Sequence, residues 1–96
     1  MITVESVNGC LLRLSDERIE HIEDHLYLNI EKVIDAVEYP DFVIPGKRGS
    51  KIAVLNLSKK HWLNVIYKEF IKQKDGFIIT AYISDAVNLS NILWER

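Results

Sequence analysis

The sequence predicts an α+β domain in which an N-terminal hairpin and two helices pack on one face of a twisted antiparallel sheet of about four strands. Apolar residues recur at helical spacing only between residues 16 and 38, whereas short β-branched and aromatic runs separated by turn residues follow Pro40. Segregation of helices and strands is typical of α+β domains rather than of alternating βαβ units. A chain of 96 residues has room for one such domain, expected to span residues 1–96.

The N-terminal residues have the pattern of a β-hairpin. Residues 2–7 alternate between apolar and polar, and residues 10–14 form the return strand. Asn8-Gly9 lies between them, and this dipeptide favours a type I′ turn because both residues adopt positive φ angles readily. We therefore expect a hairpin ahead of the helices.

Two helices are expected next, each with a capping residue at its start. Ser15 can cap a helix over residues 16–25, and Asn29 can cap a second helix that ends before Pro40. The second helix has the clearer amphipathic pattern, with apolar residues at positions i, i+3, i+4 and i+7: Ile30, Val33, Ile34 and Val37. This apolar stripe is expected to face the sheet.

Four strands and a last helix complete the expected fold. The strands are expected over residues 41–44, 51–57, 61–70 and 77–83, and a short helix over residues 87–94. The last strand follows Asp75-Gly76, a hairpin turn signal, and is apolar except for Thr80 and Tyr82. These two residues share a face because strand side chains alternate. Their hydroxyls are either hydrogen-bonded inside the sheet or line a site.

Charge is distributed unevenly along the chain. Residues 1–42 carry ten acidic and three basic side chains, whereas residues 43–96 carry nine basic and four acidic ones. The sheet half is therefore basic although the net charge is −2, and such asymmetry indicates a polyanion-binding face. Solvated surface lysines are the alternative explanation.

Other features of the composition indicate a cytoplasmic protein. Cys10 is the single cysteine, which excludes an internal disulfide framework and fits a reducing compartment. The N-terminus lacks the basic and apolar regions of a signal peptide, and no apolar run approaches the roughly 20 residues that cross a bilayer. We expect no membrane partner.

The histidines allow three kinds of chemistry. His21 and His25 lie four residues apart on one face of the first predicted helix. The spacing matches a zinc-protease helix, but Ile22 stands where that motif has its glutamate, and a metal-dependent hydrolase would need His61 as a third ligand. The other interpretations are a partner of the helix dipole and acid–base chemistry, since histidine titrates near neutral pH.

Basic residues of the sheet half are candidates for binding phosphate. Lys68 lies in a strand of alternating character, and on the sheet face it would stabilise charge that develops on a phosphate. Arg48 and Lys51 flank a glycine-containing turn and could hold neighbouring phosphates. The alternative is that all three are ordinary surface charges.

Four short motifs, taken in order, resemble a known group of nucleases. They are residues 17–22 with their histidine, residues 39–43, residues 65–68 and residues 76–82. Their order and spacing are similar to those of the small phage- and toxin-associated nuclease-like domains grouped with barnase, EndoU, the tRNA-cutting colicins and RelE. The resemblance covers roughly residues 12–84.

The resemblance implies a metal-independent endoribonuclease without a cofactor, which binds RNA across its sheet. In such enzymes the ribose 2′-hydroxyl attacks the adjacent phosphorus, and the protein supplies an acid, a base and positive charge. By resemblance, His21 would be the acid–base group, Lys68 the charge stabiliser and Thr80 a hydrogen-bond partner of the phosphate or the 2′-hydroxyl. The substrate-binding residues would be Arg48, Lys51, His25 and Tyr82.

Two features depart from the pattern of these nucleases. The group has a His-Pro pair where this chain has His25-Leu26, and the net charge of the chain is acidic. The resemblance implies RNA as the substrate and an antitoxin or immunity protein as a partner. A catalytically inactive relative that binds protein or RNA is the alternative function.

Overall fold

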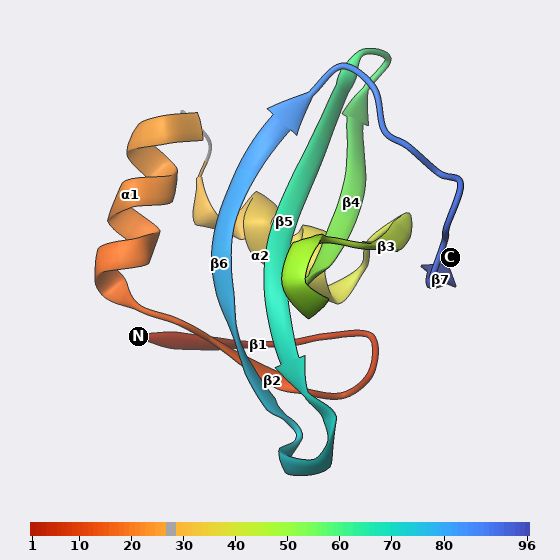
Figure 1. Cartoon of the computed structure of the whole chain (residues 1–96). Coiled ribbons are helices and arrows are strands. Elements are labelled where there is room, and N and C mark those ends of the chain that lie inside the picture. The colour runs from red at the N-terminus through yellow and green to blue at the C-terminus, as the bar shows by residue number, and fades with distance from the viewer. Residues whose placement is uncertain (27–28) are drawn as a thin grey trace.

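A computed structural model describes residues 1–26 and 29–96, with the side chains of residues 25–28 left out of the description (Figure 1). The elements in chain order are β1 (Ile2–Glu5), β2 (Leu11–Leu14), α1 (Asp16–Leu26), α2 (Ile30–Glu38), β3 (Phe42–Pro45), η1 (Lys47–Gly49), β4 (Lys51–Ser58), β5 (His61–Phe70), η2 (Ile71–Gln73), β6 (Asp75–Ser84) and β7 (Trp94–Glu95). Among the described residues, none of the helices has the length and apolar character needed to span a membrane.

The strands form one mixed sheet of seven strands, in the order β1-β2-β6-β5-β4-β3-β7. The prediction of about four antiparallel strands is therefore wrong. The N-terminal hairpin is part of the sheet, because β2 pairs with β6 in parallel, with Leu12 opposite Gly76. The other strand pairs are antiparallel.

Gly76 explains how the hairpin can join the sheet. A Cβ atom at this position would lie 2.7 Å from Leu12 Cδ2 and would also collide with the carbonyl oxygen of Lys68. Glycine thus lets three strands meet closely. Arg13 closes the junction from outside, with its guanidinium 3.2 Å from the Asp75 carboxylate. Arg13 and Gly76 are 63 residues apart in the sequence, so no local sequence pattern could indicate the contact between β2 and β6.

The helix predicted over residues 87–94 is also wrong. The chain after β6 is irregular until β7, where Trp94 pairs with Val43 of β3. The physical reason lies at Asn88, whose Oδ1 accepts a hydrogen bond from the backbone N–H of Ser90 at 3.0 Å. Such a local side-chain bond stabilises a turn in competition with a helix.

The two long helices begin at the capping residues that the sequence predicts. Ser15 Oγ accepts a bond from the backbone N–H of Arg18 at 3.1 Å, and Asn29 Oδ1 accepts one from Lys32 at 3.3 Å. Each bond satisfies a backbone donor that the first helical turn leaves without a partner. The apolar side of α2 is buried through Val33, Ala36 and Val37.

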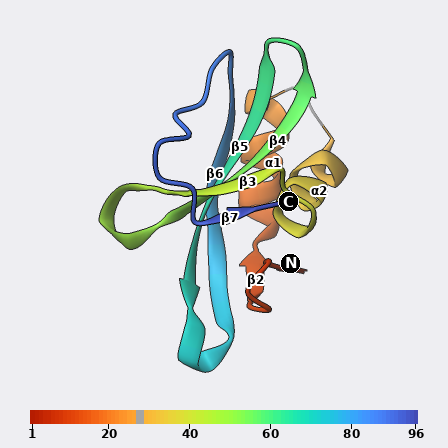
Figure 2. The ribbon, with the colours of Figure 1, turned by 90° about the vertical axis from the view of Figure 1, so that its right-hand side faces the viewer.

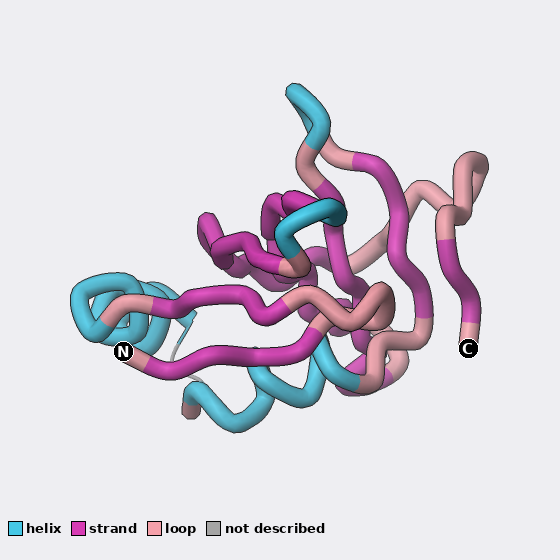
Figure 3. The backbone as a smooth tube through the Cα atoms, turned by 90° about the horizontal axis from the view of Figure 1, so that it is seen from below, coloured by secondary structure: helices cyan, strands magenta, loops and turns pink. Residues whose placement is uncertain are grey.

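Both long helices cover one face of the sheet; the opposite face, here called the open face, has no long helix of the described residues on it and is flanked by the loop between β3 and β4 and by the segment after β6 (Figure 2). The view from below shows the two long helices beside and beneath the strands (Figure 3). Leu63, Val65 and Tyr67 of β5 are buried in the core on the helical side. Because side chains alternate along a strand, Ile66 and Lys68 belong to the open face.

Candidate nucleic-acid interface on the open face

The open face carries a groove of about 750 Å³ across the centre of the sheet. Its floor is formed by isoleucines of three neighbouring strands: Ile52, Ile66 and Ile79. The η1 turn makes one wall, and Lys68 with Tyr82 adds charged and aromatic edges. The groove thus has an apolar floor with a polar rim, which is the usual form of a ligand site.

The η1 turn holds a basic side chain at the groove in a defined backbone conformation. The turn is closed by hydrogen bonds from Gly46 N–H to the Ser50 carbonyl at 2.9 Å and from Ser50 Oγ to the Lys47 carbonyl at 2.7 Å. Arg48, between them, has a φ angle of 56°, a left-handed conformation that costs a non-glycine residue about 1–2 kcal/mol. Strain of this kind persists where surrounding contacts enforce it, and it is frequent at binding sites.

The two faces of the molecule differ in charge. Lys47, Arg48 and Lys68 line the groove, and the groove lining includes no acidic residue. The helices on the other face hold eight acidic side chains and two basic ones. Three of the nine basic residues of the C-terminal half therefore line the groove, where they can attract a polyanion.

Three aromatic side chains are exposed along the hairpin formed by β5 and β6. Phe70, Phe77 and Tyr82 are 40%, 37% and 37% exposed. The rings of Phe70 and Phe77 lie with centroids 6.1 Å apart. Exposed rings on a sheet face are suited to stacking with planar ligands, bases included.

A β-bulge brings Phe77 and Tyr82 to the same face. They are five residues apart, which in a regular strand would place them on opposite faces. The register shifts between Ile66 and Tyr67, so that Ile66 lies opposite Thr80 and Tyr67 opposite Ile78, with Ile79 as the extra residue. As a result, both aromatic residues line the groove.

Several predicted site residues come together here. Arg48, Lys68 and Tyr82 all line the groove. Thr80 lies opposite Ile66, a floor residue, and is half-buried beside the groove. Phe77 and Lys47 also line the groove, although neither was predicted as a site residue. For Phe77 the reason is that the bulge in β6, which brings its side chain to the open face, leaves no local pattern in the sequence.

His21 lies elsewhere. It is exposed on α1, in the helical layer, and lines a small separate hollow with Ser15, Glu17 and Arg18. α1 packs on the core side of the sheet through Ile22, so the structure does not bring His21 together with Lys68 and Thr80 (Figure 2).

His61 lies away from the groove, and the side chain of His25 is not among the described residues. His25 belongs to α1, but its side chain is outside the described residues. His61 begins β5, where its Nδ1 lies 2.8 Å from Ser58 Oγ. In the described part of the chain, histidine, cysteine and acidic side chains form no group of three that could hold a metal ion.

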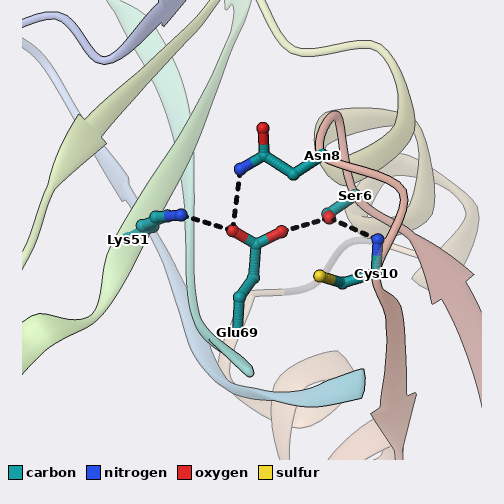
Figure 4. Close-up of polar contacts among 5 residues, drawn as sticks. All are labelled: Ser6, Asn8, Cys10, Lys51 and Glu69. Carbon is teal, nitrogen blue, oxygen red and sulfur yellow. Dashed lines mark hydrogen bonds and ion pairs between the residues drawn. The ribbon is translucent and has the colours of Figure 1, made fainter. Parts of the chain in front are cut away.

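Lys51 lies behind the sheet rather than in the groove. It pairs across the strands with Tyr67, a core residue, and its Nζ lies 2.5 Å from Glu69 Oε1 (Figure 4). The Glu69 carboxylate is 1% exposed and also accepts hydrogen bonds from Ser6 Oγ and, at 3.0 Å, from Asn8 Nδ2. Lys51 and Glu69 therefore fasten the N-terminal hairpin turn to the sheet.

This network shifts the pKa of Glu69 and of Cys10. Burial by itself raises the pKa of Glu69, but the hydrogen bonds from Lys51, Ser6 and Asn8 outweigh burial and hold that pKa below its ordinary value. Burial, reinforced by the nearby Glu69 charge, raises the pKa of the Cys10 thiol. A fully buried thiol with a raised pKa is unreactive, so we assign the network a structural role.

The lowered pKa of Glu69 predicts a loss of stability in acid. A carboxyl group with a depressed folded-state pKa stabilises the fold above its unfolded-state value of about 4.5, and this contribution is lost as the pH falls through the folded-state value. Urea unfolding at about pH 6 and about pH 3 should show a larger decrease for the natural protein than for Glu69→Gln. Equal decreases would contradict the role given to the Glu69 charge.

Comparisons with protein-family models, with curated proteins and with solved structures found no match to this chain. The groove, its charges and its exposed aromatic rings are the features of the described residues that bear on function.

Proposed function

We propose that the open face binds single-stranded RNA. The observation that carries this proposal is the presence, in one groove without acidic residues, of two exposed aromatic rings and three basic side chains. Phe77 and Tyr82 would stack with bases, while Lys47, Arg48 and Lys68 would contact phosphates. Sequence-tolerant single-strand binding commonly combines these two interactions on a sheet surface.

The groove favours binding over cleavage. Attack by a ribose 2′-hydroxyl needs a group that takes a proton and a group that gives one. Among the described residues, the groove lining has no imidazole and no carboxylate, and His21 lies in the helical layer. We therefore propose an RNA-binding module, and the ribonuclease activity implied by the resemblance stays a prediction.

RNA affinity should depend on Tyr82 and Lys68 in different ways. Loss of one stacked base costs about 1–3 kcal/mol, so Tyr82→Ala should weaken binding roughly 5- to 140-fold. Lys68→Ala should reduce the magnitude of the slope of log affinity against log salt concentration by about 0.7, the value for one phosphate contact of a single strand. Fluorescence anisotropy with a labelled single-stranded RNA at several salt concentrations measures both effects.

Lys60→Ala is the matched control, because Lys60 is an exposed lysine of the turn between β4 and β5, outside the groove. It should leave affinity nearly unchanged. Equal effects of Lys60→Ala and Lys68→Ala would show that only net charge matters and would contradict a specific groove.

The same samples separate binding from cleavage. After incubation of the protein with RNA in EDTA, gel electrophoresis should show intact RNA for the natural protein. Fragments that disappear in a His21→Ala variant would overturn the binding-only proposal in favour of the nuclease.

A further inference from the structure

A second hollow, of about 330 Å³, adjoins the groove at the end where Tyr82 lies. The two share Pro45, Ile52 and Tyr82. The hollow lies between the sheet and the irregular segment 86–91, which borders the open face (Figure 2). Its polar lining is neutral and consists of amides and hydroxyls: Asn64, Ser84, Asn88, Ser90 and Asn91.

Asn64 lines this hollow, and its side-chain amide is held in one orientation. It is 3% exposed, and its Nδ2 donates hydrogen bonds to the Trp62 carbonyl and to Ser84 Oγ, both at 3.0 Å. Ser84 Oγ in turn donates to the Ala86 carbonyl at 2.9 Å. These bonds fix the orientation of the amide and leave Oδ1, an acceptor, as its remaining polar atom.

Asn88 supplies the complementary group from the opposite wall. Its Oδ1 accepts the bond from Ser90 N–H at 3.0 Å, which leaves the Nδ2 donors for a ligand. The wall is held at its far end by the bond from Leu93 N–H to the Val43 carbonyl at 2.7 Å. One wall of the hollow therefore offers an acceptor and the other a donor.

We propose that this hollow reads the edge of one nucleobase in the RNA bound along the groove. A phosphate would require positive charge, which the lining lacks, whereas every base edge presents neutral donors and acceptors. Sequence-specific RNA recognition typically places an unstacked base between an aromatic ring and such polar groups. Tyr82, common to both hollows, supplies the ring. This proposal rests on the RNA-binding function proposed above.

Base preference is the property that tests this subsite. Anisotropy titrations with labelled oligonucleotides of adenine, cytosine or uracil alone should differ in affinity roughly 5- to 140-fold between the best and the worst base, the range for a base edge read by two hydrogen bonds. Asn88→Ala should reduce this difference to about twofold or less, with little change for the least favoured oligonucleotide. Asn88 is exposed, so this change leaves the core intact, but it also removes the Oδ1 acceptor of Ser90 N–H. Asn88→Asp keeps that acceptor and lacks the Nδ2 donors, and it should reduce the preference as well.

Lys68→Ala is the control, because it should weaken all three oligonucleotides by a similar factor and leave the preference intact. Equal binding of all three by the natural protein, or a preference that Asn88→Ala does not change, would overturn the subsite and leave RNA binding standing. Failure of the natural protein to bind any of the three would overturn the proposed function itself.

Discussion

Replacing Lys51 with methionine is expected to lower the free energy of unfolding by up to about 3 kcal/mol, the lower end of the cost of breaking a buried ion pair, because the Glu69 side chain is buried whereas Lys51 is 25% exposed. Methionine retains most of the apolar stem of lysine, so the change removes mainly the charge. The Glu69 carboxylate, 1% exposed, would lose its ion-pair partner and keep only its hydrogen bonds to Ser6 and Asn8. Urea unfolding at neutral pH measures the effect.

The control is Lys60→Met, an equivalent change at an exposed lysine, for which we expect a change within about 0.5 kcal/mol. The double variant Lys51→Met with Glu69→Leu should recover much of the loss, because it removes both charges together. A small effect of Lys51→Met would show that Glu69 is solvated or paired in another way.

Gly76→Ala is expected to destabilise the protein by about 1–3 kcal/mol or more, the usual cost of forcing an extra methyl group into a packed site. The new Cβ would meet the backbone carbonyl of Lys68, which cannot rotate aside, and would lie 2.7 Å from Leu12 Cδ2. The strands β2 and β6 would have to separate. Urea unfolding measures the loss, and faster amide hydrogen exchange in residues 11–14 would locate it.

Asp75→Ala is the matched control at the same junction. It removes the exposed ion pair with Arg13, at 3.2 Å, which is worth about 0–1 kcal/mol. A Gly76→Ala effect no larger than that of Asp75→Ala would contradict the close approach of the three strands.

Locally encoded features of the fold could be predicted from the sequence. The helix starts at Ser15 and Asn29 were correct because a capping bond joins residues three apart. The sheet was underestimated because the contact that adds the hairpin joins Leu12 with Gly76, which are far apart in the chain. β7 has two residues, too few for a periodic pattern.

The candidate site was predictable in its charges but not in its geometry. Arg48, Lys68 and Tyr82 were selected from sequence and line the groove. Lys51 was selected with them, yet it lies on the core side, since sequence pattern does not specify which face of β4 meets the helices. Phe77 was missed because the bulge at Ile79 changes the alternation of β6.

Amide chemical shifts would locate RNA on the open face. The isotope-labelled protein would be titrated with a short single-stranded RNA in EDTA. We expect shifts at residues 45–50, at Ile66 and Lys68, and at residues 77–82, with α1 and α2 unaffected. Shifts confined to the helices, or no shifts at RNA concentrations in large excess, would contradict RNA binding on the open face.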